Sequence, residues 1–238
     1  MRGRMPMRPL EEIADAAVRV FLTRGFRSAG ISDVADALGL SHGAVYTYAK
    51  SKQALLHLAL VRVLRPDEVA GLAVPVPTPE AKEVIALAES WAGDRAALPL
   101  LARVSAGPPG LPATAELGSV VDELYAFVEQ NRLVLQLVES CAEQLPELAQ
   151  WYFVERRRAI VGRLCAYLNA RITAGVLCPV PDVPAAARFV VETVAWFAMH
   201  RHHDPDSRML TDEGCRRTVH QLLVAAFPPV EASHGRHR

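Results

Sequence analysis

The chain has 238 residues, no formal net charge, 51% apolar residues and only 6% aromatic ones. This composition can bury a sizeable core, and it excludes an intrinsically disordered chain. No run of 18 apolar residues occurs, because Glu192 interrupts the most apolar segment, 188–199, so a membrane span is not expected. The first twelve residues hold three arginines and no apolar signal core, and we therefore expect a cytoplasmic protein.

The N-terminal quarter of the chain is basic. Residues 1–65 contain ten Lys or Arg against five Asp or Glu, whereas residues 66–238 contain sixteen against twenty-one. We expect residues 1–8 to form a flexible basic arm. A basic segment on a neutral chain favours contact with a polyanion such as nucleic acid.

Four helices are expected in this quarter, over residues 10–24, 31–38, 42–48 and 52–65. The first carries apolar residues at the i, i+3, i+4, i+7 spacing of an amphipathic helix, and Gly25 follows as its C-terminal stop. Gly30 is the expected N-cap of the second helix, Ser41 of the third and Ser51 of the fourth.

The remaining chain is also predicted to be helical. A proline-rich loop over residues 71–79 is followed by helices at about 80–92, 95–106, 115–144 with a break near Asn131, 146–174, 184–202 and 211–227. No segment alternates convincingly between apolar and polar residues at period two. The predicted fold class is therefore all-α.

The most informative segment is 25–56, GFRSAGISDVADALGLSHGAVYTYAKSKQALL. Ala35 is small enough for another helix to approach closely, and Gly39 permits the positive φ of a sharp turn between helices. Val45 follows as an apolar plug on the next helix. A small residue, a glycine and a β-branched residue at +0, +4 and +10 have the spacing of a helix-turn-helix, whose second helix can enter the major groove.

The segment resembles the DNA-binding domain of the TetR/AcrR family of transcriptional regulators. The resemblance is carried by the helix IADAAVRVFLTRGF, the core DVADALGLS and the run GAVYTYAKSKQALL, and it covers residues 10–56 closely. Beyond residue 56 the similarity is one of helix layout. The resemblance implies a helix-turn-helix domain over 1–56, a helical effector-binding and dimerisation domain over 57–230, and a flexible tail over 231–238.

The resemblance also implies which residues contact DNA. The residues that would face DNA or its phosphates are Ser32, His42, Gly43, Ala44, Tyr46, Thr47, Tyr48 and Lys52. Tyr46 and Tyr48 are two apart and point to different helix faces, so one of them can instead pack in the core. The chain departs from the family pattern at Gly30, at the short Ser32 and at Ala49, where a phenylalanine is common.

The last two helices are the expected dimer interface, as the family resemblance implies. Their candidate interface residues are Phe189, Val190, Val194, Phe197, Val219, Leu222, Leu223 and Phe227. The alternative is that these are ordinary core helices. A twofold dimer would read a palindrome with its two recognition helices, and an effector that favours another conformation would release both half-sites together.

In the family, the effector binds between the middle helices of the larger domain. Candidate pocket residues here are Trp91, Tyr125, Phe127, Gln136, Glu139, Trp151 and Tyr152, although for each of them a place in the core is the more common role. The apolar composition favours a small apolar or amphipathic effector. The sequence thus predicts a ligand-responsive regulator, most simply a repressor, that binds operator DNA as a homodimer.

Two other classes of protein stay open, a DNA-binding protein without a small-molecule response and a helical small-molecule-binding enzyme. No GxSxG, Walker, HExxH or dinucleotide motif supports the enzyme, so no catalytic residue and no cofactor are expected. The four cysteines form no CxxC pair, and we expect reduced thiols. The histidines near residues 200–203 are expected to form a solvated helix end, and no metal site is predicted.

Overall fold

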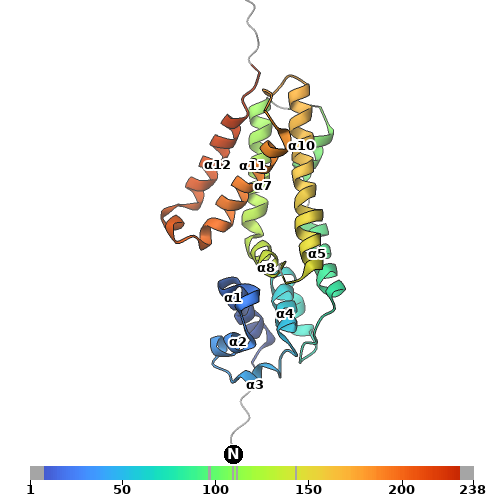
Figure 1. The fold of residues 1–238 in the computed structure, drawn as a ribbon, viewed down its shortest axis with the longest axis vertical. Coiled ribbons are helices and arrows are strands. Elements are labelled where there is room, and N and C mark those ends of the chain that lie inside the picture. The colour runs from blue at the N-terminus through green and yellow to red at the C-terminus, as the bar shows by residue number, and fades with distance from the viewer. Residues whose placement is uncertain (1–7, 96–97, 109, 111, 143, 231–238) are drawn as a thin grey trace, which may run out of the picture. The chain divides into compact units, whose positions relative to one another are not determined.

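The computed structural model describes residues 8–95, 98–108, 110, 112–142 and 144–230 (Figure 1). In these ranges the backbone forms helices and turns, with two isolated backbone bridges and no strand. The predicted all-α class is confirmed. Most of the predicted arm and the predicted tail lie outside the described residues. No described helix combines the length and the apolar character needed to cross a membrane.

The chain forms two compact units, each drawn from two stretches of sequence. The first unit comprises residues 1–95 and 133–154, and the second comprises residues 96–132 and 155–238. The predicted division at residue 56 concerns which residues bind DNA and which bind an effector. That functional division stays a prediction.

The first unit begins with four helices: α1 Leu10–Ser28, α2 Ile31–Leu38, α3 His42–Val45 and α4 Lys52–Leu64. Helix α1 packs against α4 and α2, and α2 packs against α3. The buried stripe of α1 includes Ile13, Ala17 and Phe21, which recur at the spacing of one helix face. These helices follow the sequence prediction closely, apart from the shorter α3.

The prediction that Gly25 ends the first helical stretch is confirmed, and a further helical turn follows it. The backbone leaves helical geometry at Gly25, with φ 73° and ψ 147°, yet helical structure resumes and extends to Ser28. The turn buries Phe26 against Phe21, with ring centroids 5.2 Å apart. Burial of this second aromatic ring explains why the chain continues as a further helical turn rather than a loop.

The first unit is completed by a 3-10 turn, η1 Pro66–Gly71, and by helices α5 Ala81–Arg95, α8 Arg132–Ala142 and α9 Pro146–Ala149. Helix α5 packs against α4 and α9. Pro66 stops α4, because proline has no N–H for the helical ladder and restricts the residue before it.

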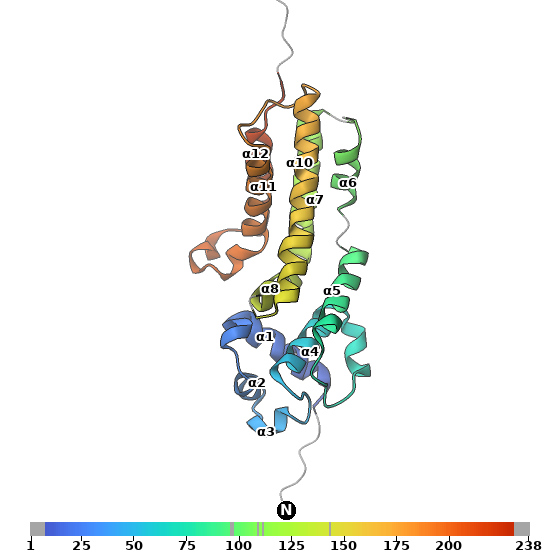
Figure 2. The same cartoon turned by 45° about the vertical axis from the view of Figure 1, so that its right-hand side comes forward.

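The second unit contains helices α6 Pro99–Ala106, α7 Ala113–Gln130, α10 Arg158–Thr173, α11 Val183–Ala198 and α12 Asp212–Ala226. Helix α10 packs against α6 and α11, while α7 packs against α11 and α12 (Figure 2). Their shared core is aliphatic, with Tyr125 and Tyr167 as its largest aromatic members.

Two helices of the C-terminal half differ from their predictions in detail. The helix expected over 146–174 is continuous from Pro146 to Thr173, but its middle part is a π-helical segment, η2 Gln150–Arg157, between α9 and α10. The helix expected to reach residue 202 ends at Ala198, and two 3-10 turns follow, η3 His200–His203 and η4 Pro205–Met209. Apolar periodicity alone does not distinguish α-helical from π-helical hydrogen bonding, because both place side chains on a continuous face.

A buried ion pair lies at one end of the second unit. Arg171 and Glu116 are 1% and 2% exposed, and Arg171 Nε donates to Glu116 Oε1 at 2.6 Å. The same guanidinium donates to the carbonyl oxygens of Val104 and Gly107, each at 3.0 Å. Arg171 therefore satisfies carbonyl groups at the C-terminal end of α6 as well as the buried carboxylate.

Candidate nucleic-acid interface

A glycine turn sets the angle between α2 and α3. Gly39 has φ 64°, and the N–H of Leu40 donates to Ala35 O at 2.9 Å, which closes the C-terminal end of α2. Ser41 then caps α3 by accepting from Ala44 N at 3.3 Å. Ala35 and Val45 are both buried, as the helix-turn-helix spacing predicts.

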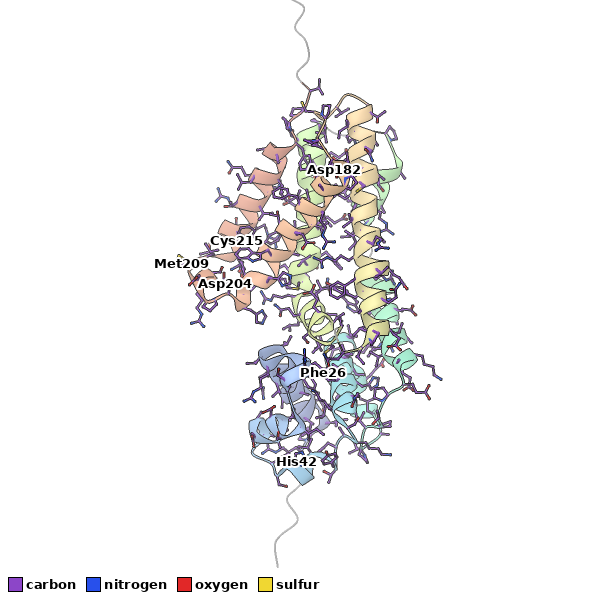
Figure 3. The ribbon with its side chains drawn as sticks, in the orientation of Figure 1. Phe26, His42, Asp182, Asp204, Met209 and Cys215 are labelled. Carbon is purple, nitrogen blue, oxygen red and sulfur yellow. The ribbon has the colours of Figure 1, made fainter. Side chains whose placement is uncertain are left out.

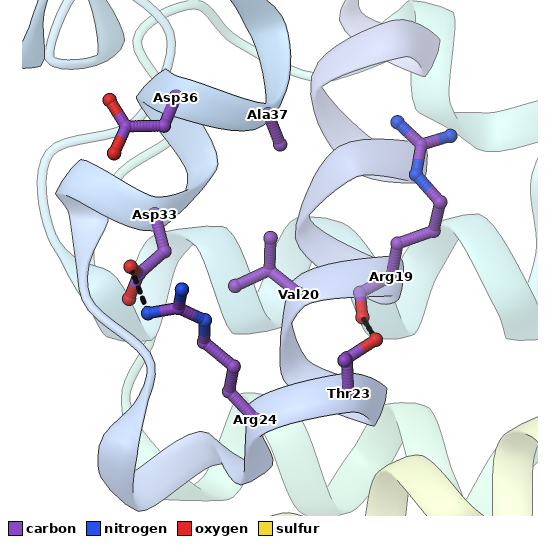
Figure 4. A pocket seen from close by; sticks show the side chains of 7 residues that line it. All are labelled: Arg19, Val20, Thr23, Arg24, Asp33, Asp36 and Ala37. Atoms are coloured by element: carbon purple, nitrogen blue, oxygen red, sulfur yellow. Dashed lines mark hydrogen bonds and ion pairs between the residues drawn. The ribbon is translucent and has the colours of Figure 1, made fainter.

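A second contact fixes α2 on α1. The guanidinium of Arg24 donates to Asp33 Oδ1 (Figure 4). Asp33 Oδ2 accepts from the backbone N–H of Gly30 at 2.7 Å. Asp33 therefore supplies the half of a capping box in which the third helical residue accepts from the N-cap N–H, while the Asp33 N–H donates to Gly30 O at 3.2 Å. The acidic side chain also suits the positive end of that helix.

Helix α3 presents an exposed surface. Tyr46 is 43% exposed, and its ring packs edge-to-face on His42 with centroids 5.4 Å apart. His42 lies at the α3 end of the first unit (Figure 3). A methyl group added at Gly43 would meet no atom within 4 Å, so this position is open. The hydroxyl of Thr47 donates to Ala44 O at 2.7 Å.

Tyr48 is placed differently from the other predicted contacts. Its side chain is 5% exposed, and its hydroxyl accepts a hydrogen bond from the backbone N–H of Arg8 at 2.8 Å. Of the two tyrosines, Tyr46 faces outward and Tyr48 packs inward. Tyr48 thus joins the chain that precedes α1 to the chain that follows α3, and its phosphate contact stays a prediction.

Lys52 is held at the end of α1. Its Nζ donates to Arg27 O at 3.1 Å and lies 4.5 Å from the centroid of the Phe26 ring. An ammonium group has three donors, so this arrangement is compatible with a phosphate contact. Ser32 is exposed on α2.

Sequence reasoning missed a support on the other side of α3. Val76 N donates to Tyr48 O at 2.7 Å, and Lys50 N donates to Val76 O at 3.0 Å. The hydroxyls of Ser51 and Thr78 are 2.7 Å apart. The proline-rich segment was predicted only as a separating loop, and its prolines give no signal of backbone pairing 27 residues away.

The predicted effector residues fall into both units. Trp91, Gln136, Glu139, Trp151 and Tyr152 belong to the first unit, and Tyr125 and Phe127 belong to the second. The hydroxyl of Tyr152 donates to Glu139 Oε1 at 2.8 Å, so two of them are in contact.

Two other members of this set have distinct surroundings. Trp91 lines a cavity of about 390 Å³ with Arg65 and Ser90. Tyr125 is fully buried, and its hydroxyl donates to Phe197 O at 3.3 Å. Tyr125 is therefore a core residue whose polar group is already satisfied.

The predicted interface residues on α11 and α12 divide by burial. Five are buried in the core of their own unit: Val190, Val194, Val219, Leu223 and Phe227. Phe189 and Leu222 are 56% and 62% exposed, Phe197 is half-buried, and Trp196 is partly exposed. A second chain can reach the exposed members without opening the core, and the dimer interface itself stays a prediction.

The histidine-rich turn after α11 makes local contacts. Nε2 of His202 lies 2.6 Å from Arg132 Nη1, while Arg201 is buried and pairs with Asp212. Burial and the neighbouring arginines lower the pKa of His202. Across the described ranges, no three His, Cys, Asp or Glu side chains converge as a metal site would require.

A helix-turn-helix with an exposed second helix, followed by a larger helical unit, defines the class of helical DNA-binding regulators. Residues 13–59 match the family model described as bacterial regulatory proteins, tetR family. The chain thus carries a TetR-family segment over residues 13–59, which confirms the family resemblance predicted from its sequence. The curated proteins contain no match to it.

Solved structures resemble the chain over nearly its full length. A tetR-family bacterial regulatory protein from Rhodococcus RHA1 is 20% identical, with a TM-score of 0.51, covering 95% of this chain and 100% of its own. The ketosteroid transcriptional regulator KstR2 of Mycobacterium tuberculosis is 16% identical, with a TM-score of 0.53 and coverages of 94% and 96%. AibR in complex with isovaleryl coenzyme A and operator DNA is 18% identical, with a TM-score of 0.53 and coverages of 93% and 100%. At these identities the likeness concerns the fold.

Proposed function

We propose that the chain is a ligand-responsive transcriptional repressor that binds a palindromic operator as a homodimer. The observation that carries the proposal is the exposed His42–Tyr46 surface on a short helix, whose support comes from the turn at Gly39 and from the Arg24–Asp33 pair on α2. The basic charge of residues 1–65 supports contact with phosphates. A protein that acts on operator DNA would work in the cytoplasm.

The proposed contacts divide into two kinds. His42, Gly43, Ala44, Tyr46 and Thr47 would approach base edges, because they lie on α3 or directly after it. Ser32 and Lys52 would contact phosphates, which position the helix without reading sequence. Tyr48 would support α3 from inside the unit.

Dimerisation would use the exposed apolar side chains of α11 and α12. Phe189, Trp196 and Leu222 are large apolar residues left in contact with solvent on two helices that pack together. In a twofold dimer, both chains would bury these side chains in the same interface. The same symmetry would place two copies of α3 on half-sites about 34–36 Å apart.

An effector would act by favouring a conformation that cannot span both half-sites. AibR has been captured with both isovaleryl coenzyme A and operator DNA, which supports a small-molecule response in this fold. We propose a small apolar or amphipathic effector, with Trp91, Gln136, Glu139, Trp151 and Tyr152 of the first unit as candidate contacts. Selection of bound DNA from a random pool, repeated with candidate effectors, tests binding and release together.

Tyr46→Ala and Lys52→Ala are each expected to weaken operator binding about tenfold or more, because each removes a proposed DNA contact worth about 1–3 kcal/mol. Lys52→Ala should also reduce the dependence of log K on log salt, by about one unit. Fluorescence anisotropy at several salt concentrations measures both effects. Arg62→Ala is a matched control, since Arg62 lies on α4 and pairs with Asp15. Unchanged affinity in both variants would refute these roles.

Gly43→Ala is expected to weaken DNA binding without lowering the stability of the fold. The added methyl group meets no protein atom, and alanine is favoured over glycine in a helix by about 0.5–1 kcal/mol. We expect the variant to be at least as stable as the wild type in urea titrations, yet to bind operator DNA several-fold more weakly, because the backbone at residue 43 would lie against the duplex. A stable variant with full affinity would show that α3 does not approach DNA at this position.

A further inference from the structure

The segment 72–79, here called the strap, is bonded to the chain that directly follows α3. Its contacts are the two backbone hydrogen bonds of Val76 with Tyr48 and Lys50 and the hydroxyl contact of Thr78 with Ser51. Val76 is buried. The position of the strap and the position of the C-terminal end of α3 are therefore linked by three polar contacts within six residues of the helix.

A cavity of about 190 Å³ lies under the strap, between it and helices α4 and α5. Its lining consists of His57, Leu72, Ala73, Val76, Pro77, Pro79 and Glu83. Five of these seven residues offer only carbon atoms from their side chains. The volume is below the range of about 300–1,000 Å³ that is usual for drug-sized ligands, so the cavity suits a molecule of fragment size.

The charge of the cavity is negative. Glu83 accepts a hydrogen bond from the backbone N–H of Glu80 at 2.8 Å, and a carboxylate has capacity for further donors. Burial lowers the pKa of His57, and nearby Glu83 opposes this only in part, so the imidazole is neutral near pH 7. Nδ1 of His57 is buried with no hydrogen-bond partner among the described residues. The neighbouring residues Glu80 and Lys82 form an ion pair with each other, so together they add no net charge next to the cavity.

We propose that this cavity binds a small apolar amine, with its ammonium group on Glu83 and its carbon body against the strap, and that occupancy strengthens DNA binding. The apolar lining would receive the carbon body, and the one carboxylate would select a cation over an alcohol or an acid. The second half of the proposal rests on the proposed function.

The direction of the effect follows from linkage. A ligand that fits the cavity stabilises the conformation in which the strap is bonded to residues 48–51, by RT ln(1 + [L]/Kd). That conformation is the one in which α3 is supported from both sides. A bound amine therefore acts in the opposite sense to an effector that releases the operator.

Binding is tested with benzylamine, benzyl alcohol and benzoate, followed by NMR chemical shifts of the labelled full-length protein. We expect saturable shifts with benzylamine at residues of the strap, α4 and α5, and at least tenfold weaker binding of the other two compounds. Glu83→Gln should weaken benzylamine binding tenfold or more, while Glu89→Gln, exposed on the same helix, should not. Ala73→Leu, which adds bulk to the cavity lining, should weaken binding. Equal binding of all three compounds, or no binding, would overturn the site.

Coupling is tested by anisotropy with a selected palindrome at saturating benzylamine. The wild type should bind the DNA at least threefold more tightly, and Glu83→Gln should show no change. Benzylamine that binds without changing DNA affinity would overturn the coupling. Absence of any DNA binding would instead contradict the proposed function, and the NMR titration would still decide whether the cavity binds an amine.

Discussion

Replacing Arg171 by Met is expected to lower the free energy of unfolding by about 3–5 kcal/mol, the usual cost of breaking a buried ion pair by removing one partner. The variant leaves the buried carboxylate of Glu116 without its cation, and the carbonyl groups of Val104 and Gly107 without a donor. Methionine keeps most of the volume, so loss of packing is a minor contribution. Urea unfolding followed by circular dichroism measures the change.

Arg65→Met is the matched control, because Arg65 pairs with Glu68 at the surface and such pairs contribute about 0–1 kcal/mol. If both substitutions cost the same, the Arg171 site would not be the buried pair described here.

The pH dependence of the free energy of unfolding tests the Arg171–Glu116 pair in a second way. Burial raises the pKa of Glu116, but hydrogen bonds from Arg171 and Gly110 outweigh it, so the pKa lies below its ordinary value. A carboxyl group with a lowered pKa in the folded state stabilises the protein above its unfolded pKa, which is about 4.3, and that contribution is lost as pH falls through the folded pKa. The wild type should therefore lose stability below about pH 4. Arg171→Met should lose less there, since desolvation of the carboxyl group is then opposed without the contribution of Arg171.

The second large effect is expected at the proposed dimer interface. Phe189→Glu combined with Leu222→Glu should raise the dimer dissociation constant at least a hundredfold, because twofold symmetry removes each apolar contact twice and brings four carboxylates together. Loss of the dimer should reduce affinity for a palindrome by a similar factor. Sedimentation velocity and anisotropy measure the two losses, and circular dichroism should show unchanged helicity, since both side chains are exposed.

Leu133→Glu provides the comparison for these substitutions, because Leu133 is a similarly exposed leucine on α8 in the first unit. It should leave the dimer and DNA binding unchanged. A Phe189/Leu222 variant that stays dimeric at micromolar concentration would place the interface on another surface.

The N-terminal helices could be predicted from the sequence because their signals are local. Gly39 and the caps Ser41 and Ser51 act within four residues, and the structure shows all three in the predicted role. The boundary between α7 and α8 was also predicted, since Asn131 weakens the helix at that point.

Other features could not be predicted because they depend on contacts far apart in the sequence. The pair of Arg171 with Glu116 spans 55 residues, and the hydroxyl contact of Ser51 with Thr78 spans 27. Similarly, helical periodicity shows that Val190 and Phe189 lie on different faces of α11, but not which face meets the core of its own unit. For the same reason, the sequence shows that Tyr46 and Tyr48 lie on different helix faces, but not which of the two is buried.

The central claim is that two copies of α3 bind one duplex, and one titration tests it most directly. A palindrome selected from random DNA is compared with the same duplex in which one half-site is scrambled, with anisotropy for affinity and sedimentation for stoichiometry. We expect two chains on each palindrome and at least a hundredfold weaker binding to the scrambled duplex. A single chain per duplex, or equal affinity for the two duplexes, would contradict the claim.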